Sequence, residues 1–68
     1  MKEVKFYMTN GTQIMFTMDE DTATKTVKNF AKAAKKNMTF EVVNPQETVV
    51  INPQEVQFIH IQEVQENE

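Results

Sequence analysis

The sequence contains no cysteine, serine, arginine, leucine or tryptophan, and its single histidine is His60. Without cysteine the chain has no disulfide, no thiolate ligand for zinc and no thiol nucleophile. Without serine it lacks the commonest hydroxyl nucleophile, and one histidine makes neither an acid–base pair nor a metal site by itself. Without arginine the chain has no guanidinium group, which binds guanine or phosphate through two parallel hydrogen bonds. We therefore expect no enzyme, no catalytic residue, no cofactor and no metal.

The length of 68 residues predicts one small domain over 1–68, with residues 65–68 as a solvated tail. No apolar run approaches the roughly 18 residues that span a bilayer. The first residues alternate charged and apolar side chains and lack the apolar centre of a signal peptide. These features predict a cytoplasmic location. The core is thin at this length, and such domains often gain stability from a partner or a second copy.

Apolar and polar side chains alternate on both sides of Asn10 and Gly11, which predicts a β-hairpin. A two-residue loop at Asn10-Gly11 would place the apolar side chains of the two strands on opposite faces. A three-residue loop beginning at Thr9 pairs Phe6 with Ile14 and brings the apolar side chains to one face. We therefore expect the longer loop.

The next segment predicts an amphipathic helix over residues 22–36, preceded by a group of acids. Its N-cap is expected at Asp21 or Thr22, since acids favour the positive end of the helix dipole. Asn37 is expected to end the helix in a left-handed conformation. The apolar positions of the helix and its end are Ala23, Val27, Phe30, Ala31, Ala34 and Met38.

The tetrapeptide Asn-Pro-Gln-Glu occurs at residues 44–47 and again at residues 52–55. Proline and the asparagine before it favour a tight turn, so each copy predicts a chain reversal that leads into a short strand. The expected C-terminal strands are 38–43, 48–51 and 56–64, arranged as a meander. The predicted fold is α+β in the order β-β-α-β-β-β: a mostly antiparallel sheet of four or five strands with one helix on one face.

The last predicted strand is apolar on both sides. Strict alternation places Val56 and Phe58 on one face and Ile59 and Ile61 on the other. An antiparallel sheet with one solvated face usually alternates more cleanly. The pattern therefore indicates that the sheet face away from the helix has an apolar patch.

One helix of about four turns shields only one face of such a sheet. The opposite face is expected to carry an apolar patch rimmed by polar residues, which is typical of a binding surface. Scattered apolar residues are also ordinary on any protein surface. The predicted partner-binding residues are Tyr7, Met15, Val43, Val50 and Phe58.

Charge is segregated along the chain: residues 22–38 carry five lysines and no acid, and residues 39–68 carry six glutamates and no base. The helical lysines lie within an arc of about 100°, away from the apolar positions. The simplest interpretation is a solvated helix face; the alternatives are an acidic protein partner and a phosphate-binding surface for nucleic acid. The candidate phosphate-binding residues are Lys25, Lys28, Lys32, Lys35 and Lys36.

Residues 49–61 contain an Ile-Asn-x-x-x-Val-x-x-Ile pattern, formed by Ile51, Asn52, Val56 and Ile59. With the preceding hairpin and helix, the chain resembles short uncharacterised β-β-α-β-β proteins of Gram-positive bacteria and their phages. The resemblance implies an accessory or host-interacting protein of prophage type, and it implies no activity.

The sequence as a whole favours a small non-enzymatic protein-interaction module. It is predicted to bind a protein partner, or itself as a homodimer, through the helix-free face of the sheet. Opposite charge in the helix and the C-terminal segment would orient that association. The alternative is a nucleic-acid-associated protein that uses the lysine face of its helix.

Overall fold

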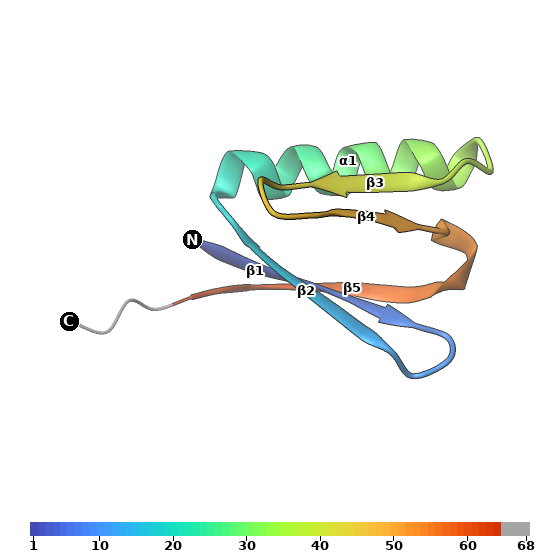
Figure 1. The fold of residues 1–68 in the computed structure, drawn as a ribbon, viewed down its shortest axis with the longest axis horizontal. Helices are drawn as coiled ribbons and strands as arrows, with labels where there is room; N and C mark the ends of the chain where they lie inside the picture. Colours follow the sequence, from blue (N-terminus) through green and yellow to red (C-terminus); the bar gives the residue numbers. More distant parts are fainter. Residues whose placement is uncertain (65–68) are drawn as a thin grey trace.

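A computed structural model, which describes residues 1–64, shows an α+β fold in the predicted order of elements (Figure 1). The predicted tail at residues 65–68 lies outside the described part of the chain. The elements are β1 (Lys2–Met8), β2 (Gln13–Met18), α1 (Glu20–Lys35), β3 (Phe40–Val43), β4 (Thr48–Ile51), the short 3-10 turn η1 (Pro53–Glu55) and β5 (Val56–Glu63).

The strands form two antiparallel sheets and not the single predicted sheet of four or five strands. One sheet has the order β2-β1-β5, and the other is the hairpin β3-β4. The predicted C-terminal meander is wrong, because β5 pairs with β1 and not with β4. The second Asn-Pro-Gln-Glu forms η1, where the Gln54 side chain donates to Asn37 at the end of α1. This turn carries the chain from one sheet to the other (Figure 1).

The β1–β2 hairpin has the predicted three-residue loop, and Phe6 lies opposite Ile14. The N–H of Met8 donates to the carbonyl of Thr12 at 2.8 Å, and the N–H of Gly11 donates to Met8 at 3.1 Å. Gly11 has φ of +89°, a backbone conformation that a side chain disfavours. Glycine at this position therefore sets the loop length, and the loop length sets which side chains face the core.

The helix begins two residues earlier than predicted, and its N-cap is Asp19 and not Asp21 or Thr22. Asp19 has extended backbone, and its carboxylate accepts from the N–H of Thr22 at 2.7 Å. Glu20 and Asp21 then occupy the first turn, where the helix dipole favours acids. Hydrogen bonds from Thr22 hold the pKa of Asp19 below its ordinary value. The ionised cap stabilises the helix above that ordinary value, and the contribution is lost as the pH falls through the lowered pKa.

The end of α1 confirms the predicted left-handed Asn37, whose φ is +57°. The next residue departs from prediction: Met38 is 58% exposed, and β3 begins at Phe40 instead of residue 38. The reason is local, because the N–H of Met38 donates to the carbonyl of Ala33 at 2.9 Å and so completes the helix cap. A residue held by the cap does not pair with β4.

The core-facing side of α1 is narrower than the predicted apolar stripe. Ala23 is buried, and Val27, Phe30 and Ala33 are partly buried, whereas Ala31 and Ala34 are exposed. Ala31 lies at the side of the stripe, and Ala34 lies in the last turn of α1. Alanine has a high helix propensity and is common on solvated helix faces, so an alanine in the pattern does not indicate that the position is buried.

Four phenylalanines from four elements form the centre of the core. The ring of Phe6 on β1 is fully buried, and its centroid lies 5.9 Å from Phe16, 5.6 Å from Phe30 and 6.2 Å from Phe40. Ile51 of β4 is also buried, at 2% exposure. No ladder of backbone hydrogen bonds joins the two sheets within residues 1–64. These side chains therefore hold the β3–β4 hairpin against the rest of the domain.

The prediction that the Val56 and Phe58 side chains point to the same face is wrong, because β5 contains a β-bulge at its start. Tyr7 pairs with Phe58, and the next residue, Met8, pairs with Val56, so that Gln57 is an extra residue. Val56 thereby packs against the core. Phe58 lies on the opposite face and is 54% exposed.

Candidate interaction surfaces

The outer face of the β2-β1-β5 sheet is the helix-free face predicted from the sequence. Figure 1 shows α1 and the β3–β4 hairpin on the other side of this sheet. Val4 and Phe6 of β1 point into the core, so the residues of β1 that alternate with them point outward. The residues that pair with these outward residues on β2 and β5 point outward as well. The outer-face residues of the sheet are Glu3, Lys5, Tyr7, Gln13, Met15, Thr17, Phe58, His60 and Gln62.

An aromatic pair lies at one end of this outer face. The rings of Tyr7 and Phe58 are stacked, with centroids 4.4 Å apart and planes at 18°. Phe58 is 54% exposed, and Met15 on β2 is 55% exposed. The bulge in β5 creates the pair, because it places Phe58 directly opposite Tyr7. Three of the five predicted partner-binding residues therefore lie on one face.

The other end of the outer face is polar. Lys5 and Glu3, which are neighbours on this face of β1, form an ion pair at 3.3 Å. His60 is exposed and lies opposite Lys5 on the same face. The apolar area is thus limited to one end of the sheet, with polar residues beside it.

The remaining predicted partner-binding residues, Val43 and Val50, belong to the other sheet. Phe40 and Ile51 of the hairpin point into the core, so alternation turns Val43 and Val50 outward. They are 68% and 58% exposed. The five residues predicted for one face are therefore divided between two sheets, because the strands themselves are divided.

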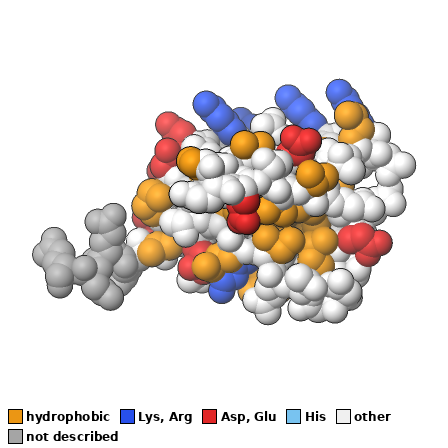
Figure 2. Space-filling model, in the orientation of Figure 1, with side chains coloured by type: hydrophobic (Ala, Val, Ile, Leu, Met, Phe, Trp, Pro, Cys, Tyr) orange, Lys and Arg blue, Asp and Glu red, His pale blue; other side chains and the backbone are white. Residues whose placement is uncertain are grey.

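All five helical lysines are exposed, and they lie on the side of α1 that faces away from the core. Figure 2 shows lysine side chains projecting along the edge of the molecule that α1 forms. The ion pairs within residues 1–64 involve Lys2, Lys5 and the N-terminus, and none of the helical lysines. The predicted lysine face is thus brought together on one surface: Lys25, Lys28, Lys32, Lys35 and Lys36.

A hollow of about 360 Å³ lies between β2, the first half of α1 and β3. Sequence reasoning missed it, because it depends on the separation of the two sheets. A local signal was present in β2, which has no charged residue although edge strands usually carry one. Its lining comprises residues 15–18, residues 40–43, the helix residues Thr22, Thr26 and Asn29, and the turn residues Asn44 and Glu47.

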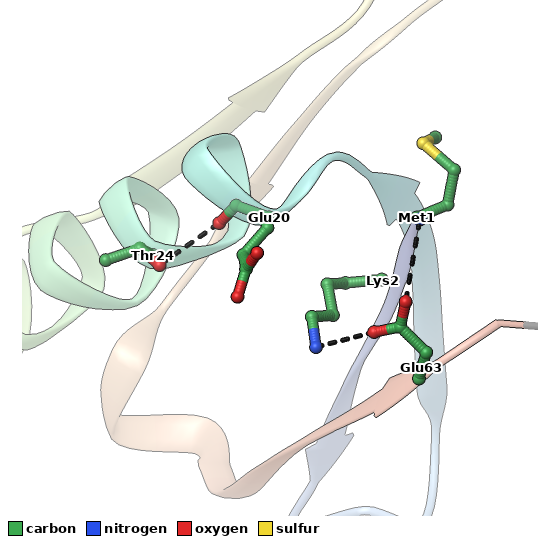
Figure 3. A network of polar contacts seen from close by, with 5 residues as sticks. All are labelled: Met1, Lys2, Glu20, Thr24 and Glu63. Carbon is green, nitrogen blue, oxygen red and sulfur yellow. Dashed lines mark hydrogen bonds and ion pairs between the residues drawn. The ribbon is translucent and has the colours of Figure 1, made fainter.

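A second hollow of about 350 Å³ lies below the start of α1, where Figure 3 shows Glu20 and Lys2 near each other. The Nζ of Lys2 contacts a carboxylate oxygen of Glu63 at 2.6 Å, which ties β1 to the end of β5. This contact raises the pKa of Lys2 and lowers that of Glu63. The Lys2–Glu63 ion pair joins the two termini of this sheet, which indicates a structural contact.

Residues 1–64 contain no cluster of three or more side chains suited to a metal ion, and no helix among them is long and apolar enough to cross a membrane. No family model matches the chain, and no curated protein or solved structure matches it significantly. The functional argument therefore depends on the surfaces themselves.

Proposed function

We propose that this protein is a small non-catalytic interaction module that binds a protein partner, or a second copy of itself, through the outer face of the β2-β1-β5 sheet. The observation that carries the proposal is the stacked Tyr7–Phe58 pair, with Phe58 and Met15 each more than half exposed. Exposed aromatic residues grouped on a sheet face and bordered by polar side chains are typical of the centre of an interface.

The distribution of charge supports an oriented association. The lysines project from α1, whereas Glu41 and Glu47 lie on the hairpin. Both groups lie on the side of the sheet opposite the outer face, so they would act on the approach of a charged partner through long-range attraction, which influences the association rate and orientation. Apolar burial at Tyr7, Met15 and Phe58 would supply most of the affinity.

Substitution of Phe58 by Asp is expected to weaken association at least about 30-fold, because a central aromatic residue is replaced by a charge that must be desolvated. The matched control is Gln62→Asp, which adds the same charge to the same face of β5 at its polar end. Sedimentation at high micromolar concentration measures self-association, and capture from a bacterial lysate measures binding of other proteins. Circular dichroism should show the same helix content in both variants.

Two outcomes would contradict the proposal. A wild-type protein that sediments as a monomer at high micromolar concentration excludes the homodimer. If Phe58→Asp also captures the same proteins as the wild type, the outer face is not the binding surface.

A second candidate function, nucleic-acid binding, is supported by the five exposed helical lysines, which have no ion pair within residues 1–64. If they bind phosphates, DNA or RNA should bind at about 50 mM salt and weaken steeply by about 200 mM. The double substitution Lys28→Glu and Lys32→Glu should abolish binding, whereas Lys5→Glu, on the outer sheet face, should weaken it far less. Fluorescence anisotropy measures both effects, and no binding at low salt ends this candidate.

A further inference from the structure

The free edge of β2 has backbone groups that the sheet does not use. Because the N–H of Met8 donates to Thr12, the hydrogen-bonded pairs with β1 recur at every second residue of β2. The residues between those pairs are Gln13, Met15 and Thr17, and their N–H and C=O groups point away from β1. Since β2 is at the edge of its sheet, no neighbouring strand in residues 1–64 pairs with these groups.

The free edge of β3 is arranged in the same way. The N–H of Asn44 donates to the carbonyl of Glu47 at 2.9 Å, so the hydrogen-bonded pairs of this hairpin include Val42 but not its neighbours. The N–H and C=O groups of Glu41 and Val43 therefore point away from β4.

Both free edges face the same hollow. Its lining includes residues of β2 and β3. Among residues 1–64 it includes none from β1, which pairs with β2, and none from β4, which pairs with β3. The hollow thus lies between two rows of unpaired backbone donors and acceptors. Such rows bind extended segments by adding a strand.

The edge of β2 also lacks the features by which proteins prevent strand addition. Its six residues include no charge, no proline and no glycine. By contrast, β5, the other edge of the same sheet, contains the bulge and Glu63. Protected edges carry charges or bulges, so β2 is the edge open to pairing.

The charge around the hollow determines what kind of segment fits. Its charged lining residues are Glu41 and Glu47, and no lysine lines it. The hollow is therefore acidic and favours a basic segment. A second copy is a poor occupant, because its lysines lie on α1, at the C-cap of α1 or on the central strand β1.

We propose that the hollow between β2 and β3 binds an extended basic segment of another protein, which adds as a strand and joins the two sheets into one. The order would be β5-β1-β2, the bound segment, then β3-β4. About four residues of the segment would pair with both walls, since β3 is four residues long. The inference rests on the proposed role as a protein-interaction module but uses the backbone edge of β2 and not the side chains of the outer face.

The test uses the full chain and a library of random linear peptides displayed on phage, selected at about 50 mM salt to retain electrostatic binding. The selected peptides are expected to be basic and to alternate apolar and polar residues. In the complex, the amides of Met15, Thr17, Glu41 and Val43 should exchange more slowly with solvent. This measurement needs no substitution and so does not depend on a variant folding.

Two matched pairs of variants locate the binding. Thr17→Pro removes a backbone N–H that points away from β1, so it leaves the ladder with β1 intact and should weaken binding at least about tenfold. The control is Thr48→Pro, which removes an outward N–H on β4 and should not weaken binding. The double variant E41Q/E47Q should weaken binding severalfold at low salt. The double variant E20Q/E55Q makes the same change in net charge away from the hollow and should have little effect.

Recovery of no peptide, or of neutral or acidic peptides, overturns the inference. So does equal binding by Thr17→Pro and the wild type. Peptides that are lost with Phe58→Asp but not with Thr17→Pro occupy the outer face; they overturn the strand-addition inference while supporting the proposed function. Peptides that depend on Thr17 and the two glutamates, but not on Phe58, establish the hollow as a separate site.

Discussion

Substitution of Phe6 by Ala is expected to destabilise the protein by about 3–5 kcal/mol, the usual loss for a buried phenylalanine. Phe6 is fully buried and contacts three other phenylalanine rings, so its removal leaves a cavity where β1, β2, α1 and β3 meet. A domain of 68 residues has a total stability of only about 3–10 kcal/mol. We therefore expect a large part of the variant to be unfolded at room temperature.

Thermal and urea denaturation, followed by circular dichroism, measure this effect, and the midpoint temperature should fall by more than about 12 °C. Phe58→Ala is the matched control, because it removes the same atoms from a ring that is 54% exposed. It should cost no more than about 1.5 kcal/mol, mainly through loss of stacking on Tyr7. Similar losses for the two variants would contradict the assignment of Phe6 as the centre of the core.

Local patterns predicted the elements and the first hairpin because their determinants are close in sequence. Gly11 determines the loop, and the alternation around it determines which of Phe6 and its neighbours face inward. Asn37 ends the helix as predicted. The helix start was misplaced because acids occur at three successive positions, and only backbone geometry shows that Asp19 is the cap.

The division into two sheets was not predictable in the same way, since it depends on pairing between distant residues. Both Asn-Pro-Gln-Glu copies have the same local hydrogen bond, in which the asparagine side chain accepts from the glutamine N–H. The first copy connects paired strands, whereas the second leads into β5, which pairs with β1. Identical tetrapeptides thus have different tertiary roles, and burial of Ile59 opposite Phe6 favours the pairing with β1.

The candidate sites also combine features that local patterns predict with features that depend on pairing between distant residues. Tyr7, Met15 and Phe58 share a face as predicted, although Phe58 reaches it through a bulge that alternation does not reveal. Val43 and Val50 are on a separate sheet because β3 and β4 pair only with each other. The hollow between the sheets has no counterpart in the linear pattern, apart from the lack of charge in β2.

Ile51→Ala is the second substitution for which we expect a large effect, about 2–5 kcal/mol, and we expect it to be greatest in the β3–β4 hairpin. Ile51 is 2% exposed and lies opposite Phe40, so these two side chains fasten the hairpin to the core. No ladder joins the hairpin to the other sheet within residues 1–64, and a two-stranded hairpin alone is marginally stable in water. Loss of Ile51 should therefore release the hairpin before the rest of the domain unfolds.

Amide hydrogen exchange distinguishes local release from global unfolding. In Ile51→Ala, protection should fall most in β3 and β4 and least in β1, the central strand of the other sheet. The control is Val50→Ala, at the adjacent position of β4, where the side chain is 58% exposed and the change should stay within about 0.5 kcal/mol. A uniform loss of protection would show instead that the two sheets unfold as one unit. Because β3 forms one wall of the hollow, local release should also weaken any segment bound there, while the outer face around Phe58 keeps its structure.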